Sequence, residues 1–279
     1  MHRDLFLFYV NTAITLLAAN MSRYSVLLFT RAHTGSDALT GFVFGVSFIP
    51  TALLGPYAGV TADKYNRKRI IILTQLLITT TVALFAFGFV SEDEIFSLAL
   101  PFFFALGLGV ALTFMIPARF ALLGNLVPEA DIMKSTTIVQ LIIIAGFGLA
   151  PLATGILKTY VDWRTFFYIS AGLYLAGLLF ILPVKPRFPQ RPRDETTTLV
   201  EGMRFVGSFP PVRDLLIYAC IGLFLLGPVQ VVLPHFVKVH FSLSESQRGT
   251  FISLLGFGLI AGGIGVRILK PSSHRGRWI

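Results

Sequence analysis

The residues with the greatest capacity for chemistry are polar side chains that interrupt long apolar runs. Arg23 is the one clearly ionisable case; it lies near Asn20 in the first run, and both are candidates to line a cavity or contact a substrate. A charged group inside a membrane is costly, so it is a functional candidate by default. Arg23 lies toward one end of its run, however, where its side chain could simply extend to the interface. A substrate or gating role and an interfacial role therefore both remain open for Arg23.

Four further polar residues lie inside apolar runs and could contact a ligand in a central cavity. They are Asn11, Gln140, Gln230 and His235. Polar side chains between membrane helices also hydrogen-bond to one another, and this simpler role competes with ligand contact at each position. No Asp or Glu lies deep in any run, although proton-coupled membrane proteins commonly use such an acid. The sequence therefore does not identify a coupling ion: coupling residues could lie in a missing half of the protein, or His235 could titrate.

The rest of the sequence gives no sign of bond-making chemistry. It contains no phosphate-binding glycine loop, no zinc-ligand spacing and no nucleophile beside a base. We therefore expect that the chain is not an enzyme and that it uses no metal and no cofactor. The single cysteine, Cys220, lies in an apolar run, which indicates a packing residue and excludes an internal disulfide.

Composition places the chain in a lipid bilayer. Hydrophobic residues make up 54% of the 279 residues and charged residues 13%, and the mean hydropathy is +0.76. Soluble domains carry about 25% charged residues, so this chain is too apolar to hide its surface by folding alone. The net charge of +9 could suggest nucleic acid. The basic residues lie at the ends of apolar runs, however, where they orient a membrane protein, so we expect no nucleic-acid partner.

Eight runs are long enough to cross a membrane, which takes about 20 residues. Their approximate bounds are 5–29, 41–62, 70–90, 95–123, 136–157, 166–183, 215–236 and 250–269. Runs of this length without period-two alternation predict helices, so the predicted fold class is an all-α integral membrane protein. The fourth run is too long for one straight span. We expect its end, 117–123, to leave the membrane as a turn or short helix.

The distribution of basic residues predicts the orientation. Most Lys and Arg fall on one side of the membrane when the N-terminus is placed inside and the loops alternate. We therefore expect a multi-pass protein of the cell membrane, the inner membrane where there are two, with its N-terminus and central linker cytoplasmic. The predicted organisation is a six-helix bundle over 1–184, a linker with an amphipathic helix over 185–213, two helices of an incomplete second bundle over 214–269, and a polar tail over 270–279.

A short charged loop between the second and third runs carries the clearest family signature. Its motif residues are Gly59, Asp63, Arg67 and Lys68. Their spacing, Gly-x-x-x-Asp-x-x-x-Arg-Lys, closely resembles the loop motif of the major facilitator superfamily, with Asn66 in place of the usual glycine. In that family the aspartate is understood to cap or pair at a neighbouring helix end, and the arginines to pair with acids across the bundle. The resemblance implies a gating role for Asp63 and Arg67, whereas Lys64 and Arg69 are expected only to orient the protein.

Two further stretches resemble the branch that includes enterobactin exporters and macrolide efflux proteins. They are 117–129, PARFALLGNLVPE, and 201–206, EGMRFV. The fifth run also carries a degenerate form of the antiporter motif of exporters, at Gly146, Ala150, Pro151 and Gly155. The resemblance implies secondary active efflux of a bulky amphipathic small molecule, such as a siderophore or a macrolide, by alternating access. The partners that it implies are this small-molecule substrate and the lipid bilayer.

The chain is short for the family that it resembles. Members usually continue for several more spans, whereas the residues after 269 are polar and basic. We expect from this that the chain is truncated at its C-terminus. A transport-incompetent membrane fragment, or a subunit that joins an oligomer or a second chain, is therefore the alternative to a transporter.

Overall fold

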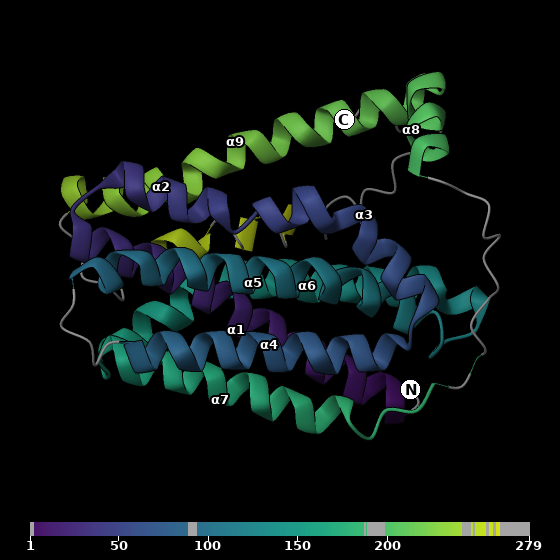
Figure 1. The fold of residues 1–279 in the computed structure, drawn as a ribbon, viewed down its shortest axis with the longest axis horizontal. Helices are drawn as coiled ribbons and strands as arrows, with labels where there is room; N and C mark the ends of the chain where they lie inside the picture. Colours follow the sequence, from purple (N-terminus) through teal and green to yellow (C-terminus); the bar gives the residue numbers. More distant parts are fainter. Residues whose placement is uncertain are drawn as a thin grey trace.

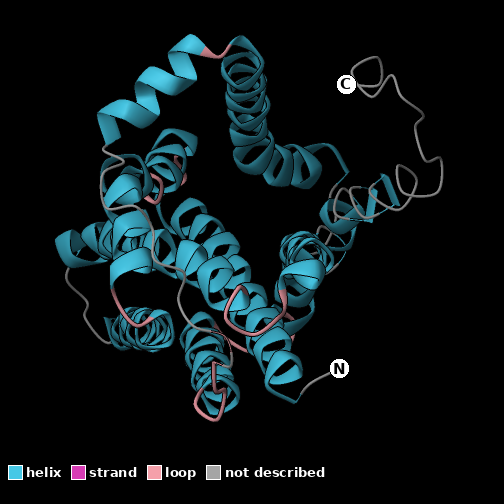
Figure 2. Cartoon of the chain, turned by 90° about the vertical axis from the view of Figure 1, so that its right-hand side faces the viewer, coloured by secondary structure: helices cyan, strands magenta, loops and turns pink. Residues whose placement is uncertain are grey.

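The computed structural model describes most of the chain. The described residues are 3–88, 94–186, 188, 199–241, 247, 249–254, 257–258 and 261–262. Within the later helices the side chains of some residues, including Gln230 and His235, lie outside the described part. Figure 2 shows that the regular structure in the described ranges consists of helices joined by loops.

The elements follow one another as a series of long helices. They are α1 (Arg3–Thr34), α2 (Asp37–Val46), α3 (Ile49–Lys64), α4 (Arg67–Gly88), α5 (Glu94–Leu123), η1 (Glu129–Asp131), α6 (Ile132–Lys158), α7 (Trp163–Ile181), α8 (Leu199–Ser208) and α9 (Pro210–Phe241). Among the described residues, six segments are long and apolar enough to cross a membrane: α1, α2 with α3, α4, α5, η1 with α6, and α7. The predicted all-α membrane class is confirmed.

The last two predicted spans lie in the later part of the chain. The run 215–236 falls within α9, and the run 250–269 overlaps helical residues at 249–254, 257–258 and 261–262. The remainder of 250–269 lies outside the described residues, as does the predicted tail. The division into two bundles therefore stays a prediction.

The first six spans form one bundle in which α1 contacts four other helices. Helix α1 contacts α6 and α7 extensively and also touches α2 and α5, while α4 packs between α5 and α7 and α3 packs on α5. In Figure 1, α4 and α7 run together along the lower edge, and α9 lies above α2 and α3. Aromatic rings fill part of the interior: Phe85 lies 5.4 Å from Phe29 and 4.6 Å from Phe167, measured between ring centroids. The core is therefore shared by helices that are distant in sequence.

The turn between α1 and α2 shows how local sequence sets the helix ends. Gly35 has φ of 65°, a left-handed conformation that glycine adopts without strain, and its N–H bonds to the Arg31 carbonyl oxygen at 3.0 Å. Ser36 then caps α2, because its hydroxyl accepts from the Leu39 N–H at 3.2 Å. Asp162 caps α7 in the same way through the Thr165 N–H at 3.3 Å. These caps place the chain reversals at one end of the bundle.

The second span is broken into α2 and α3, and the break packs closely against α5. At Gly109 of α5 an added Cβ would overlap the Ser47 carbonyl oxygen and meet Pro50 Cγ at 3.1 Å. One turn further along, the hydroxyls of Thr51 and Thr113 lie 2.9 Å apart. Glycine at position 109 therefore sets how near the broken span can approach α5.

Replacing Gly109 by alanine is expected to destabilise the protein by about 1–3 kcal/mol, because the methyl group would push the Ser47 backbone away from α5. Thermal unfolding in detergent micelles would measure the loss. Gly172→Ala on α7 is the matched control, since an added Cβ there meets nothing within 4 Å. If both variants unfold at the same temperature as the natural chain, the close approach at Gly109 does not limit packing.

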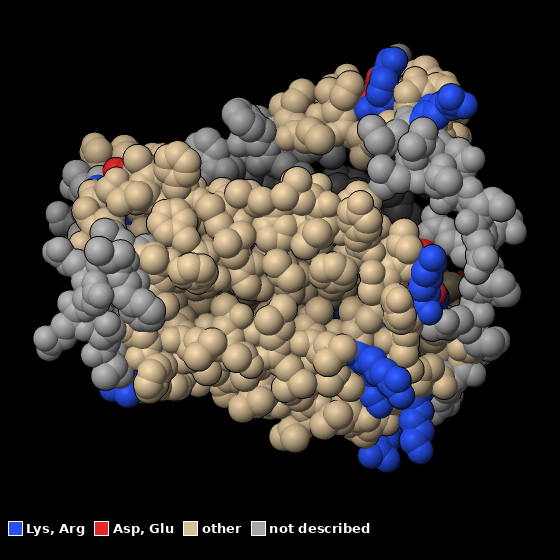
Figure 3. All heavy atoms as spheres, in the orientation of Figure 1, with Lys and Arg blue, Asp and Glu red and all other residues tan. Residues whose placement is uncertain are grey.

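Charge on the surface is concentrated at the ends of the bundle. At the right of Figure 3, Lys and Arg side chains gather where α3 gives way to α4, and the face between the two ends is almost free of charge. We call the end that carries the α3–α4 loop, the end of α5 and the end of α7 the basic end. Large apolar side chains are exposed between the ends, among them Leu53, Leu73 and Leu179. Such an uncharged band suits contact with lipid.

Candidate functional site

Arg119 is a charged residue in the interior of the bundle. We expected 117–123 to leave the membrane as a turn or short helix, and no separate turn or helix forms there. Helix α5 continues through Pro117 to Leu123, and the Arg119 side chain is only 1% exposed. The proline is tolerated because the surrounding helices hold α5 in place. The arginine is accepted there because polar groups of α1 face it.

The Arg119 guanidinium binds α1 through two oxygen atoms. Its Nη1 donates to Asn11 Oδ1 at 2.8 Å and to Thr12 Oγ1 at 2.7 Å, and Nη2 lies 3.3 Å from Met115 Sδ. All these partners are uncharged, and Nε has no partner within the described part of the chain. The guanidinium is thus a buried cation that is stabilised by neutral polar groups alone. Loss of any one of these partners would raise the cost of burying the charge.

Asn11 extends the contacts of Arg119 to two more helices. Its Nδ2 donates to Gln75 Oε1 of α4 at 3.0 Å and to the Gly177 carbonyl oxygen of α7 at 2.8 Å. Gln75 Nε2 in turn donates to the Tyr174 carbonyl oxygen at 2.7 Å. We call Asn11, Thr12, Gln75 and Arg119 the polar core. It joins the first, third, fourth and sixth spans, and Asn11 is fully buried at its centre.

Two of the predicted cavity residues hydrogen-bond between or along helices. Asn11 takes the helix-to-helix role that competed with ligand contact, and Asn20 Nδ2 donates to the Leu16 carbonyl oxygen of its own helix at 2.9 Å. Arg23 is half-buried, its guanidinium carbon lies 5.1 Å from the centre of the Phe48 ring, and its Nε is buried without a partner among the described residues. Arg23 therefore packs on the break between α2 and α3.

Sequence reasoning missed Arg119 and Gln75. The available signal for Arg119 was its isolation, because it is the one charged residue between Glu94 and Glu129. Gln75 had a similar signal as the amide in the otherwise apolar and threonine-containing run 70–88. Arg119 falls in the segment 117–123, which was expected outside the membrane, and Gln75 lies six positions after Arg69, the end of the basic cluster.

The basic residues of the loop motif bind helix ends. Arg67 Nε donates to the Ala62 carbonyl oxygen of α3 at 3.1 Å, and its Nη1 donates to the Ala121 carbonyl oxygen of α5 at 3.4 Å. Lys68 Nζ donates to the Leu182 carbonyl oxygen at the end of α7. The family expectation that Arg67 pairs with an acid is not met within the described residues. Cations are instead placed where carbonyl groups and helix dipoles concentrate negative charge.

The other two motif residues lie on α3. Asp63 is half-buried in the last turn of this helix, and Gly59 lies one turn before it in open space, since an added Cβ would meet nothing within 4 Å. The gating role predicted for Gly59, Asp63, Arg67 and Lys68 stays a prediction.

The antiporter-like motif lies on α6 and contacts two different neighbours. At Gly146 an added Cβ would lie 3.4 Å from the Leu17 nitrogen, so this glycine admits α1. Ala150 is buried beside it. At Pro151 and Gly155 the neighbour is the segment 249–254: a Cβ added to Gly249 would overlap the Pro151 carbonyl oxygen and lie 3.3 Å from Gly155 Cα. Small residues on α6 thus let helices approach on both sides.

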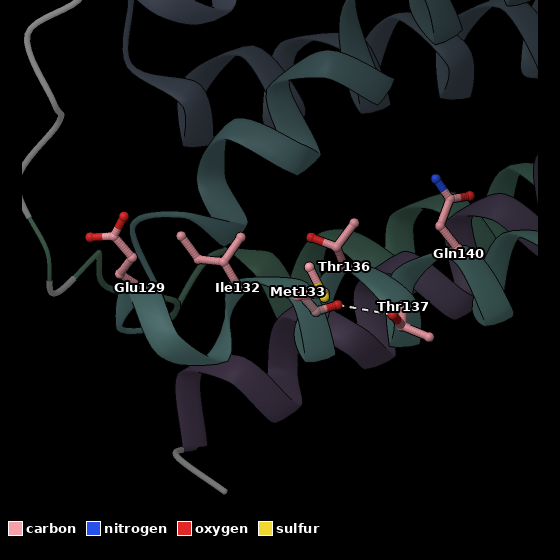
Figure 4. Close-up of a pocket in the computed structure, with 6 residues that line it drawn as sticks. All are labelled: Glu129, Ile132, Met133, Thr136, Thr137 and Gln140. Atoms are coloured by element: carbon pink, nitrogen blue, oxygen red, sulfur yellow. Dashed lines mark hydrogen bonds between the residues drawn. The ribbon is translucent and has the colours of Figure 1, made fainter. Parts of the chain in front are cut away.

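A pocket of about 540 Å³ opens on the other half of α6, toward the basic end. Its lining comprises Glu129, Ile132, Met133, Thr136, Thr137 and Gln140. Figure 4 shows these residues along successive turns of η1 and α6, with Glu129 at one end of the row and Gln140 at the other. One carboxylate, three neutral polar groups and two apolar side chains can accommodate an amphipathic molecule. Gln140 is the predicted cavity residue that lies here; Gln230 and His235 have side chains outside the described residues.

A bundle of membrane-spanning helices with a polar core and a pocket on α6 has the architecture of a membrane transport protein. The model of the Major Facilitator Superfamily matches residues 7–279, so the chain belongs to this family. The members of this family are transporters and not enzymes.

Known relatives agree with this assignment. The uncharacterized MFS-type transporter YfiS of Bacillus subtilis is 27% identical over 241 residues, which cover 82% of this chain and 53% of the relative. Macrolide efflux protein A of Streptococcus pyogenes is 21% identical over 246 residues, which cover 84% of this chain and 60% of the relative. This chain therefore spans little more than half the length of such relatives.

Solved structures show the same fold. The crystal structure of a bacterial homolog of the human lysosomal transporter Spinster, inward-facing and occupied, aligns with a TM-score of 0.72 and 17% identity. The alignment covers 97% of this chain and 62% of that one. At this identity the likeness concerns the fold alone.

Proposed function

We propose that this chain is the transport-active part of a secondary transporter that exports a bulky amphipathic small molecule, such as a macrolide or a siderophore, by alternating access. The observation that carries the proposal is the pocket on α6, which places Gln140, Thr136 and Glu129 along a surface that also presents apolar side chains. The similarity to macrolide efflux protein A supports export and a large substrate.

The proposed orientation places the basic end in the cytoplasm. The N-terminus, the α3–α4 loop and the end of α7 lie at this end, and basic residues mark the cytoplasmic side of membrane proteins. The pocket on α6 lies near the same end, because Glu129 and Ile132 follow the turn after α5. A substrate from the cytoplasm or the inner leaflet would therefore reach it directly.

Accumulation measurements test the proposal. The 279-residue chain would be expressed in cells that lack their own macrolide and siderophore exporters, and the uptake of one radiolabelled compound of each class would be followed. We expect cells that express the chain to contain about tenfold less of at least one compound at steady state than cells without it. A tenfold concentration ratio corresponds to a free energy of about 1.4 kcal/mol.

The same assay separates the transporter from its alternative. Membranes would be probed for the chain by immunoblot, so that absence of protein is not mistaken for absence of activity. Unchanged accumulation of both compounds at normal protein levels would contradict export by this chain. That result would instead support a fragment or a subunit that needs a second chain.

A further inference from the structure

Asn125 lies where three parts of the basic end meet. It follows α5 by two residues and is buried, with only 3% of its surface exposed. Its Oδ1 accepts a hydrogen bond from Arg67 Nη1 of the loop motif. On its other side Asn125 exchanges two hydrogen bonds with Phe188. The Asn125 Nδ2 donates to the Phe188 carbonyl oxygen at 3.0 Å, and the Phe188 N–H donates to the Asn125 backbone carbonyl oxygen at 3.0 Å.

The amide is the side chain that can make both contacts at once. Its oxygen accepts from the guanidinium, while its nitrogen donates to a backbone carbonyl. A carboxylate could bind Arg67 but has no hydrogen to give Phe188, and an apolar side chain could do neither. Arg67 in turn is fixed by the Ala62 and Ala121 carbonyl oxygens, so the asparagine oxygen is held by a cation that has little freedom.

The contact reaches beyond the six-span bundle. Phe188 lies after α7, within the predicted linker 185–213, which leads toward α8 and α9. The Lys185 N–H also lies 3.4 Å from Asp4 Oδ1, so the start of this segment touches the beginning of α1. Asn125 adds a second attachment, and this one is connected to the loop motif.

We infer that Asn125 is a positioning residue that couples Arg67 of the α3–α4 loop to the segment after α7, so that the loop motif and the start of the linker move as one unit. The loop motif thereby acts on the linker through a neutral amide. The inference rests on the packing of the basic end and not on the substrate. It can therefore fail while the proposed export holds, and it can hold while the proposed export fails.

Hydrogen exchange of the peptide that contains Phe188, measured by mass spectrometry on the full chain in lipid nanodiscs, tests this coupling. Asn125→Asp keeps an acceptor for Arg67 but removes the donor to the Phe188 carbonyl oxygen. We expect exchange of this peptide to become about fivefold faster, the change that loss of one hydrogen bond produces. Arg67→Met should also accelerate it, although Arg67 does not touch Phe188, because the Asn125 amide loses its anchor.

Arg69→Met is the matched control. Arg69 lies two residues after Arg67 and is exposed, so this variant removes the same charge without disturbing a buried contact. It should leave exchange at Phe188 unchanged. Peptides from α5 report whether each variant keeps its fold, and Asn125→Asp carries the test if Arg67→Met does not fold. The inference is overturned if the Phe188 peptide exchanges in Asn125→Asp at the rate of the natural chain. It is also overturned if Arg67→Met and Arg69→Met accelerate this exchange equally.

Discussion

Replacing Asn11 by leucine is expected to destabilise the bundle by about 3 kcal/mol, because it removes a principal partner of a buried charge. Leucine has the same branching as asparagine but larger methyl groups, so it leaves no cavity, and the same replacement at Gln75 reports the effect of bulk. Arg119 would retain only Thr12 Oγ1 and the Met115 sulfur atom. Reversible unfolding in mixed micelles, followed by tryptophan fluorescence, would measure the free energy of unfolding.

Gln75→Leu is the control that isolates the effect of charge. Gln75 belongs to the polar core but does not touch Arg119; its bonds go to Asn11 and to the Tyr174 carbonyl oxygen. Neutral bonds between membrane helices contribute about 0.6 kcal/mol on average and up to about 1.7 kcal/mol, so this variant should lose about 1 kcal/mol.

The double variant Asn11→Leu with Arg119→Met supplies the decisive comparison. Removing the cation together with its partner leaves no stranded charge, so the double variant should recover most of the stability that Asn11→Leu loses. Equal losses for Asn11→Leu and Gln75→Leu, or strictly additive losses in the double variant, would show that Asn11 does not compensate the charge of Arg119.

Replacing Gln140 by tryptophan is expected to lower efflux by at least about tenfold, the equivalent of about 1.4 kcal/mol of lost substrate binding. The indole would occupy part of a pocket of about 540 Å³ and would remove an amide that can orient a ligand. Accumulation of the exported compound would be compared at matched protein levels in the membrane.

Ile156→Trp provides the matched substitution on the same helix. Ile156 is 48% exposed and lies beyond the antiporter-like motif, away from the pocket lining. It adds a similar bulk to α6, so efflux should stay near that of the natural chain. If Gln140→Trp exports normally, the pocket on α6 does not hold the substrate.

The sequence was sufficient to predict the membrane fold, because the length and apolarity of each run are properties of the run alone. It did not predict the polar core, because that depends on which runs become neighbours. Asn11 and Arg119 are 108 residues apart, and only the packing of α1 on α5 and α7 shows that one is the partner of the other. Length also misled: the fourth run is too long for one straight span, which suggested that 117–123 forms a separate element, whereas α5 continues without interruption to Leu123.

The loop motif illustrates the same limit at the basic end. Its spacing identified the family, but the identity of the atoms that Arg67 binds could not be predicted from spacing. Carbonyl groups have no signature in sequence, and Asn125 is an unremarkable residue in a turn until Phe188 is brought beside it. Residues that act through backbone atoms are therefore the ones that a reading of side-chain types overlooks.

The polar core also sets an order of events during synthesis. The chain is synthesised from its N-terminus, so Asn11, which lies 108 residues before Arg119, already exists when the arginine emerges. Asn11 itself is fully engaged only when Gly177, 166 residues later, has been added. A ribosome that stops between these two points leaves a helix bundle whose central amide still lacks one bond. Completion of the sixth span thus supplies the last hydrogen bond of the amide that holds the charge.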